Sequence, residues 1–184
     1  MRIITGKARG VRLETLDGLD TRPTSERTKE AVFSMLQFNI AGSEVLDLFA
    51  GSGQMGLEAL SRGAARVHLI DKSKGAHDVI KRNVQKTRLE VGAKVVCEDS
   101  IAFLKRQDGS IKFDIVFIDP PYASELIDHA LSVLYSNELI KSTSIIVCES
   151  DRFDILGVEN SKKYDIIKTM KHGVAHISVL KPII

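Results

Sequence analysis

The stretch Val45-Leu46-Asp47-Leu48-Phe49-Ala50-Gly51-Ser52-Gly53 decides the fold. Residues 45–49 form a short apolar run that is typical of a buried strand. Gly51 and Gly53 then allow a sharp turn, where a ligand can approach the backbone at points that a Cβ atom would block. The apolar pattern at Leu57 and Leu60 predicts a helix directly after the turn. A strand, a glycine-rich turn and a helix in this order form the ligand-binding unit of a doubly wound α/β sheet.

Further apolar runs alternate with helix-like segments along the chain. Strands are expected at 66–70, 94–97, 113–118 and 144–148. This alternation predicts an α/β sheet that is mostly parallel and covered by helices on both faces. The tail departs from it, because residues 163–169 and 174–180 predict two neighbouring strands whose short connection requires antiparallel pairing. We therefore expect a doubly wound, Rossmann-like sheet with an antiparallel C-terminal hairpin, which is the methyltransferase variant of this fold.

The composition is that of one ordinary globular domain. Of the 184 residues, 43% are hydrophobic and 27% are charged, so the chain can bury a substantial core. It has no apolar run of membrane-spanning length and no signal-peptide pattern, so we expect a cytoplasmic protein without a membrane partner. Cys97 and Cys148 lie in strand-like runs and are expected to be reduced core thiols. The scattered histidines predict no metal site.

The first 40 residues are expected to form a small extension to a main domain at 41–184. Turn signals at Gly6 and Gly10 suggest a β-hairpin between residues 2 and 16. After Pro23, a helix capped by Thr24 or Ser25 is expected to run to about Gln37.

The start of this extension is basic. Residues 1–12 contain no acidic side chain and carry four basic ones, Arg2, Lys7, Arg9 and Arg12. The net charge of the whole chain is only +2, which is weak support for nucleic-acid binding. The pattern therefore leaves two interpretations open, a solvated basic hairpin or a set of contacts to phosphates.

The glycine turn admits two cofactors. Gly51-x-Gly53-x-x-Gly56, followed by Asp71 after 20 residues, also fits a nicotinamide-dinucleotide site. Asp47 argues against it, because a carboxylate in the crevice repels a pyrophosphate and attracts a sulfonium cofactor with a free α-amino group. Asp71 can accept hydrogen bonds from ribose hydroxyls. Asp99 can accept from an adenine amino group or cap the helix that follows, and the two roles are compatible. We therefore expect S-adenosylmethionine, bound by Asp47, Phe49, Gly51, Gly53, Asp71 and Asp99.

A second motif, Asp119-Pro120-Pro121-Tyr122, follows the expected strand at 113–118. Its prolines rigidify the turn and thereby fix the Asp119 side chain and the Pro120 carbonyl. An exocyclic amine on a nucleobase is a poor nucleophile, and two acceptors on its hydrogens would aim its lone pair at a methyl group. Tyr122 would stack on the base. The catalytic residues predicted in this way are Asp119, Pro120 and Tyr122. The alternative is a rigid turn at a strand end with an acid that caps a helix.

The motifs together resemble those of the bacterial small-subunit ribosomal RNA guanine-N2 methyltransferase family. The resemblance rests on residues 47–53 and 56–64, on Asp119-Pro120-Pro121-Tyr122, and on the N-terminal Ile3-Ile4-Thr5-Gly6 and Arg22-Pro23-Thr24. The last two matter because Asp-Pro-Pro-Tyr is shared with DNA amino-methyltransferases. Gln54-Met55 and Ser100 depart from the residues expected there, which leaves details of the cofactor pocket open.

The resemblance implies methylation of a guanine N2 in small-subunit ribosomal RNA, with the RNA or the small subunit as partner. It favours the phosphate-contact interpretation of the basic arm. The implied substrate-binding residues are Arg2, Lys7, Arg9, Arg12, Arg22 and Tyr122. The alternatives are a DNA adenine-N6 or cytosine-N4 methyltransferase, which the absence of a recognition domain disfavours, a nicotinamide-dependent oxidoreductase, and a non-enzymatic RNA-binding module.

Overall fold

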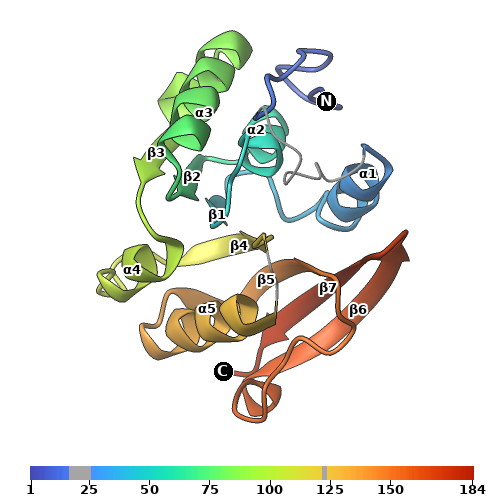
Figure 1. Cartoon of the computed structure of the whole chain (residues 1–184), viewed down its shortest axis with the longest axis vertical. Helices are drawn as coiled ribbons and strands as arrows, with labels where there is room; N and C mark the ends of the chain where they lie inside the picture. Colours follow the sequence, from blue (N-terminus) through green and yellow to red (C-terminus); the bar gives the residue numbers. More distant parts are fainter. Residues whose placement is uncertain (17–25, 122–123) are drawn as a thin grey trace.

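The computed structural model describes residues 1–16, 26–121 and 124–184. Within them, a seven-stranded sheet has the order β3-β2-β1-β4-β5-β7-β6 (Figure 1). The strands are β1 Glu44–Asp47, β2 Arg66–Asp71, β3 Ala93–Cys97, β4 Phe113–Ile118, β5 Ile140–Ser150, β6 Tyr164–His172 and β7 Ala175–Pro182. Strands β1 to β5 pair in parallel, whereas β7 pairs antiparallel with both β5 and β6. The expected Rossmann-like sheet with an antiparallel C-terminal hairpin is confirmed.

Helices cover both faces of the sheet (Figure 1). One face carries α1 Glu26–Met35, α2 Gln54–Ser61 and α3 Lys74–Thr87, and the other carries α4 Ser100–Lys105 and α5 Ser124–Ser136. Successive strand side chains alternate between two apolar cores, as a pleated strand requires. Val45 faces the core under α1, α2 and α3, and its neighbour Leu46 faces the core under α4 and α5.

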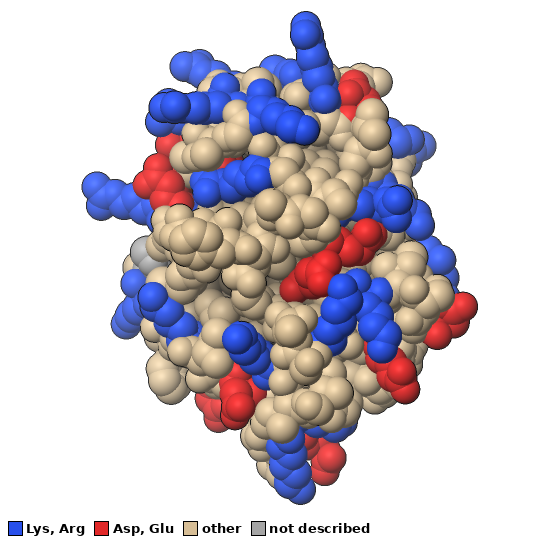
Figure 2. All heavy atoms as spheres, turned by 180° about the vertical axis from the view of Figure 1, so that it is seen from behind, with Lys and Arg blue, Asp and Glu red and all other residues tan. Residues whose placement is uncertain are grey.

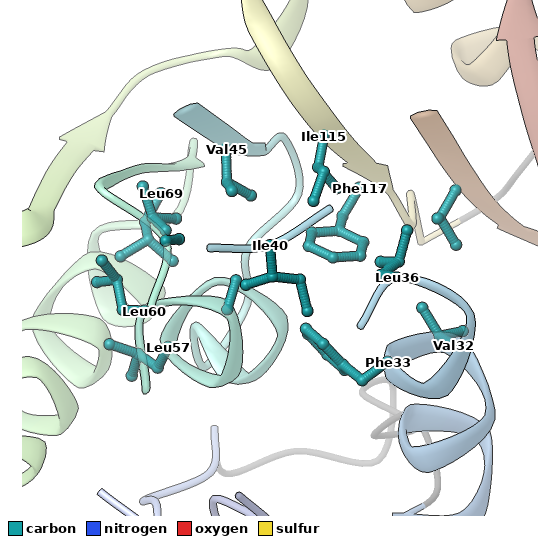
Figure 3. Packing of buried hydrophobic residues seen from close by; sticks show 14 of the residues in the cluster. Val32, Phe33, Leu36, Ile40, Val45, Leu57, Leu60, Leu69, Ile115 and Phe117 are labelled. Atoms are coloured by element: carbon teal, nitrogen blue, oxygen red, sulfur yellow. The ribbon is translucent and has the colours of Figure 1, made fainter. Parts of the chain in front are cut away.

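The first of these cores joins α1 to the centre of the sheet. Phe33 of α1 contacts Phe117 of β4 with ring centroids 5.7 Å apart, and the Arg62 guanidinium lies 4.7 Å from the centroid of the Phe33 ring. Figure 3 shows Phe33 and Phe117 pointing toward each other, with Leu57 and Leu60 on the α2 side. Because α1 follows the N-terminal segment in the chain, this contact anchors the extension to the sheet.

Two details differ from the sequence predictions, and a third is not tested. Helix α1 ends at Met35, slightly before the expected end at Gln37. The expected capping residues Thr24 and Ser25 lie outside the described residues. Cys148 is buried as predicted, but Cys97 is exposed, so its assignment as a core thiol is wrong. The reason is that β3 is an edge strand, whose outer side has no neighbouring strand.

The predicted N-terminal hairpin forms only in part. Arg2 and Arg12 make an isolated antiparallel bridge, and the amide of Ile3 donates to the Val11 carbonyl at 3.0 Å. The segment is therefore a closed loop with antiparallel pairing at its base and no extended ladder. A two-stranded hairpin is marginal by itself, so its shape must come from packing against the domain.

The buried carboxylate of Glu58 on α2 holds this arm in place. It accepts hydrogen bonds from the Ile4 amide at 2.8 Å and the Thr5 amide at 3.0 Å. It also pairs with Lys29 of α1 at 3.3 Å, and both side chains are fully buried. Lys29 in turn donates to the Arg2 carbonyl at 2.5 Å. A buried charge needs such a complete set of partners, so α1, α2 and the arm are fixed together at this carboxylate.

The arm approaches α2 closely at Gly6, and this gives a matched test. Gly6 and Gly10 both have positive φ angles, 88° and 84°, so alanine at either position incurs about 1–2 kcal/mol of backbone strain. Only at Gly6 would the new Cβ atom collide, because it would lie 1.8 Å from the Ser61 carbonyl oxygen, whereas nothing lies within 4 Å at Gly10. We expect Gly6→Ala to lower the free energy of unfolding by about 1–3 kcal/mol more than Gly10→Ala in urea titrations. Amide exchange at Ile4 should also accelerate only in Gly6→Ala. Equal losses in the two variants would contradict the docking of the arm on α2.

Candidate active site

Three carboxylates meet at the carboxyl edge of the sheet. Asp47 is the last residue of β1, Asp71 is the last residue of β2, and Asp119 directly follows β4. The parallel register pairs Asp47 with Leu69 of β2 and with Phe117 of β4, so these strand ends are neighbours. In open α/β sheets, ligands bind in the crevice at this edge. The structure thus brings the two sequence motifs to one place.

The glycine turn has the geometry that its sequence predicts. Gly51 and Gly53 have φ angles of 55° and 78°, which side chains with a Cβ atom rarely adopt. A Cβ atom at Gly51 would meet nothing within 4 Å, so the backbone there borders open space. At Gly56 the situation is opposite, since a Cβ atom would lie 2.6 Å from Leu69 and 2.7 Å from Val67. Gly51 therefore leaves room for a ligand, and Gly56 lets α2 pack tightly on β2.

Asp47 is a buried acid beside this turn. Its Oδ2 accepts a hydrogen bond from the Gly56 amide at 2.9 Å, and the residue is 5% exposed. Burial raises the pKa of Asp47 to about 7, the Gly56 amide opposes this rise, and the charge of Asp71 adds to it. A carboxylate held in this way gains from a nearby cation, which would stabilise its ionised form.

Three backbone amides of the turn already donate to acceptors within the protein. The Gly51 amide donates to Asp71 Oδ2 at 2.9 Å, the Gly53 amide donates to the Ala50 carbonyl at 2.6 Å, and the Gly56 amide is bonded to Asp47. A dinucleotide pyrophosphate needs free amides and positive charge at such a turn. Here it would meet two carboxylates instead, so these residues do not suit NAD. They suit a ligand with hydroxyl and ammonium donors.

Asp99 and Phe49 each lie two residues after a strand, β3 and β1, at the same edge of the sheet. The Asp99 side chain caps α4 by accepting from the amides of Ile101 and Ala102, both at 3.0 Å. The helix-cap interpretation of Asp99 is therefore confirmed, and contact with an adenine stays a prediction. Phe49 is half-buried and packs against the core under α4 and α5. Ser100, one of the unexpected residues, is buried and its hydroxyl donates to the Leu48 carbonyl, which ties α4 to the turn.

A narrow pocket lies next to the second motif. It is lined by Val32, Met55, Phe117, Ile118, Asp119, Val147, Glu149 and Ile177. Asp119, one of these lining residues, is exposed, and the adjoining Pro120 is buried. Tyr122 lies outside the described residues. Sequence reasoning noted Met55 only as a departure from the expected residues and did not name Glu149. An acid at the end of the apolar run of β5 was a usable signal, because β5 ends at the same edge as β4.

The predicted basic arm is exposed. Arg2, Lys7, Arg9 and Arg12 all reach solvent, and Arg2 pairs with Glu26 at 3.4 Å. Arg22 lies outside the described residues. The arm is also tied to α3, where the Asn83 side chain accepts from the Glu14 amide at 2.7 Å and donates to the Glu14 carbonyl at 3.0 Å.

Helix α3 extends the basic surface. Its outer face and C-terminal cap carry exposed Lys81, Arg82, Lys86 and Arg88. Figure 1 places α3 and the N-terminal arm at the same end of the molecule. Figure 2 shows Lys and Arg side chains gathered at that upper end, with few acidic side chains between them. The cations of the arm therefore belong to a larger positive surface.

The described parts of the chain hold neither a metal-binding cluster nor a membrane-spanning helix. None of the His, Cys, Asp and Glu side chains there gather in a group of three that could hold a metal ion. Among the helices in those parts, none has the length and apolar character needed to cross a membrane.

Comparisons with known proteins agree with this geometry. The chain is 39% identical over 153 residues to ribosomal RNA small subunit methyltransferase D of Haemophilus influenzae, covering 83% of this chain and 79% of that protein. The structure of the putative methyltransferase yhhF of Escherichia coli superposes with a TM-score of 0.86 at 31% identity, covering 99% of this chain and 97% of the other. SMU.776, a putative methyltransferase complexed with SAH, shares the fold with a TM-score of 0.66 at 17% identity, covering 90% of this chain and 51% of the other.

The family model described as conserved hypothetical protein 95 matches residues 1–181, which includes the arm, the glycine turn and the Asp119 motif. The chain thus belongs to this family, the one shared by bacterial proteins named small-subunit ribosomal RNA methyltransferase D.

Proposed function

We propose that the protein transfers a methyl group from S-adenosylmethionine to the exocyclic N2 of a guanine in small-subunit ribosomal RNA. The observation that carries this proposal is the meeting of Asp119 and Pro120 with the Asp47 turn at one edge of the sheet. The names of the relatives support ribosomal RNA as the substrate. In this proposal residues 41–184 form the catalytic domain, and residues 1–40 form an extension that contacts RNA.

The cofactor is S-adenosylmethionine, which supplies an electrophilic methyl group. Asp47 would face its positively charged part, and Asp71 would accept from its ribose hydroxyls. Gly51 and Gly53 leave the backbone open to it, and Phe49 and Asp99 would border its adenine. These roles fit the buried carboxylate of Asp47, the amide-bonded turn and the open space at Gly51.

The residues of the second motif would prepare the amine. Asp119 and the Pro120 carbonyl would each accept one hydrogen bond from the target nitrogen, which orients its lone pair. Asp119 can also take the proton that the nitrogen loses after transfer. Tyr122 would stack on the base and keep it out of its helix. Fixing the nitrogen and the methyl group in line lowers the entropic part of the barrier.

The arm would bind the RNA backbone. Arg2, Lys7, Arg9, Arg12 and Arg22 would contact phosphates, which position an RNA without reading its sequence. The basic face of α3 adjoins the arm through Asn83 and would lengthen this contact. Specificity then depends on the shape of the folded RNA.

The proposal is tested most directly at Asp119. We expect Asp119→Ala to fold and bind cofactor but to lose roughly 10²–10⁴ in methyl-transfer rate, the usual contribution of a positioned acid–base group. Asp119→Asn should retain more activity, since its amide oxygen still accepts one hydrogen bond. Tyr122→Ala should weaken productive RNA binding by about 1–3 kcal/mol. The measurement is single-turnover methylation of ribosomal RNA or small subunits, with the product nucleoside identified by mass spectrometry. Full activity of Asp119→Ala would refute the mechanism, and N6-methyladenine as product would refute the guanine assignment.

The pKa of Asp47 predicts the pH dependence of cofactor binding. Because this pKa is about 7, the carboxylate is mostly neutral at low pH and gains charge as the pH rises. Affinity for S-adenosylmethionine should therefore increase from about pH 5.5 to about pH 7.5, a range in which an α-amino group stays largely protonated. Calorimetry on Asp47→Asn should give weaker binding without this increase. An Asp47→Asn protein with the same pH dependence as the wild type would exclude Asp47 as its source.

Asp47 also makes the stability of the cofactor-free protein depend on pH. Stability should fall as the pH rises, whereas cofactor affinity should increase. The native pKa of Asp47, about 7, lies above the ordinary 3.8, so the native state holds more protons than the unfolded state between these values. The contribution of Asp47 to the free energy of unfolding is therefore lost as the pH rises from about 4 to about 7. Urea unfolding at both ends of this range should show a smaller loss for Asp47→Asn than for the wild type.

The basic arm is tested through salt dependence. Replacing Arg9 and Arg12 with alanine should weaken RNA binding and reduce the slope of log affinity against log salt by up to about one unit per lost contact. Cofactor affinity should not change. A matched control is the double alanine variant of Lys162 and Lys168, which are exposed residues of the 3-10 turn Asn160–Lys162 and of β6. If both double variants lower the slope equally, the arm has no special role in binding.

A further inference from the structure

Glu149 lies beside Asp119 at the carboxyl edge of the sheet. Strands β4 and β5 pair in parallel with Phe117 opposite Val147 and Ile118 opposite Cys148. Asp119 directly follows Ile118, and Glu149 directly follows Cys148. Adjacent strands are separated by about 4.8 Å, so the two acids come from neighbouring backbones. Both line the narrow pocket under α1.

The two acids also share one face of the sheet. Phe117 and Val147 both point into the core under α1, α2 and α3. Side chains two positions apart on a strand point to the same side, so Glu149 follows Val147 toward that face. Glu149 is half-buried, and the side chains that line the pocket with the two acids are apolar, including Val32, Met55 and Phe117. A ligand edge at this mouth therefore meets two carboxylates above an apolar floor.

Such a pair discriminates between nucleobases by their Watson–Crick edges. Guanine presents two neighbouring donors there, the N2 amine and N1–H. Adenine presents its N6 amine beside an N1 lone pair, and cytosine presents N4 beside an N3 lone pair. A carboxylate next to the one that holds the amine would accept from guanine N1–H, whereas it would repel the lone pair of adenine or cytosine. A site built to accept a hydrogen bond from N1–H strongly disfavours a base that lacks this donor, because the carboxylate is then left unpaired.

We propose that Glu149 is the residue that selects guanine, by accepting a hydrogen bond from N1–H while Asp119 holds the N2 amine. This inference rests on the proposed function and adds the residue that reads the base. Met55, which departs from the residue that the family resemblance leads us to expect, would contact the base from the α2 side of the same pocket. Selection by this acid would provide base specificity from within the crevice itself.

The test changes the base and the acid together. The substrate is small-subunit RNA in which the guanosine that the wild-type protein methylates is replaced by 2-aminopurine riboside. This analogue keeps the amine at C2 but has a lone pair at N1. The wild-type protein should methylate guanine at least about tenfold faster than 2-aminopurine in single turnover. Glu149→Gln keeps an oxygen that can accept from guanine N1–H and gains an amide N–H that can donate to the N1 lone pair of 2-aminopurine, so it should remove most of the roughly tenfold preference or reverse it.

A matched control separates this role from a structural one. Asp151→Asn removes a neighbouring exposed acid that does not line the pocket, and it should keep the wild-type ratio of the two rates. Affinity for S-adenosylmethionine should be the same in all three proteins. If Glu149→Gln keeps the wild-type ratio of guanine to 2-aminopurine rates, whatever its absolute rate, Glu149 does not select the base. If the wild-type protein itself forms no N2-methylguanine, the proposed function fails first, and this outcome is distinguishable from the other.

Discussion

The hydrogen bond from the Gly56 amide to the Asp47 carboxylate is the interaction on which the site depends. It joins the end of β1 to the first turn of α2, and it requires the close contact of Gly56 with Val67 and Leu69. The anion-binding position at a helix N-terminus is thereby occupied by a carboxylate of the protein itself. This one bond converts a turn that could hold a phosphate into one that favours a cation, and it explains why a G-x-G-x-x-G sequence need not indicate a dinucleotide.

A second buried carboxylate, Glu58, lies on the same helix and joins it to α1 and to the basic arm. Its partners come from α1 and from the backbone of Ile4 and Thr5. Burial lowers the pKa of Lys29, and the charge of Glu58 opposes this change. Removing Glu58 would leave the buried Lys29 ammonium without its carboxylate, which costs about 3–5 kcal/mol, whereas Glu58 would keep its pair with Arg62 if Lys29 were removed. The position of the arm is thus coupled to the integrity of the core, although the arm itself has almost no regular structure.

Sequence reasoning succeeded where local rules determine the outcome. The strand-end positions of Asp47, Asp71 and Asp119 follow from apolar runs and turn residues alone. It failed where tertiary packing decides. Glu58 has the appearance of an ordinary exposed helix residue, and only the folded chain shows that it is fully buried against the arm. Cys97 was misplaced because a periodic pattern does not reveal that β3 lies at an edge. Glu149 was overlooked because its significance comes from the register between β4 and β5.

Positive and negative side chains are concentrated in two separate regions of the molecule, and each region attracts a different part of a nucleic acid. The exposed cations of the arm and α3 attract a polyanion over a distance set by the ionic strength, roughly 8–10 Å. The carboxylates at the edge of the sheet repel phosphates, but they attract the amino and imino hydrogens of a base that has left its stack. A backbone phosphate is therefore unfavourable at the pocket, and an exposed base edge with two donors is favourable there. Under the proposed function, the basic surface would hold the RNA and leave the acidic crevice to a single flipped base, so a chain with a net charge of only +2 would combine RNA binding with an acidic active site.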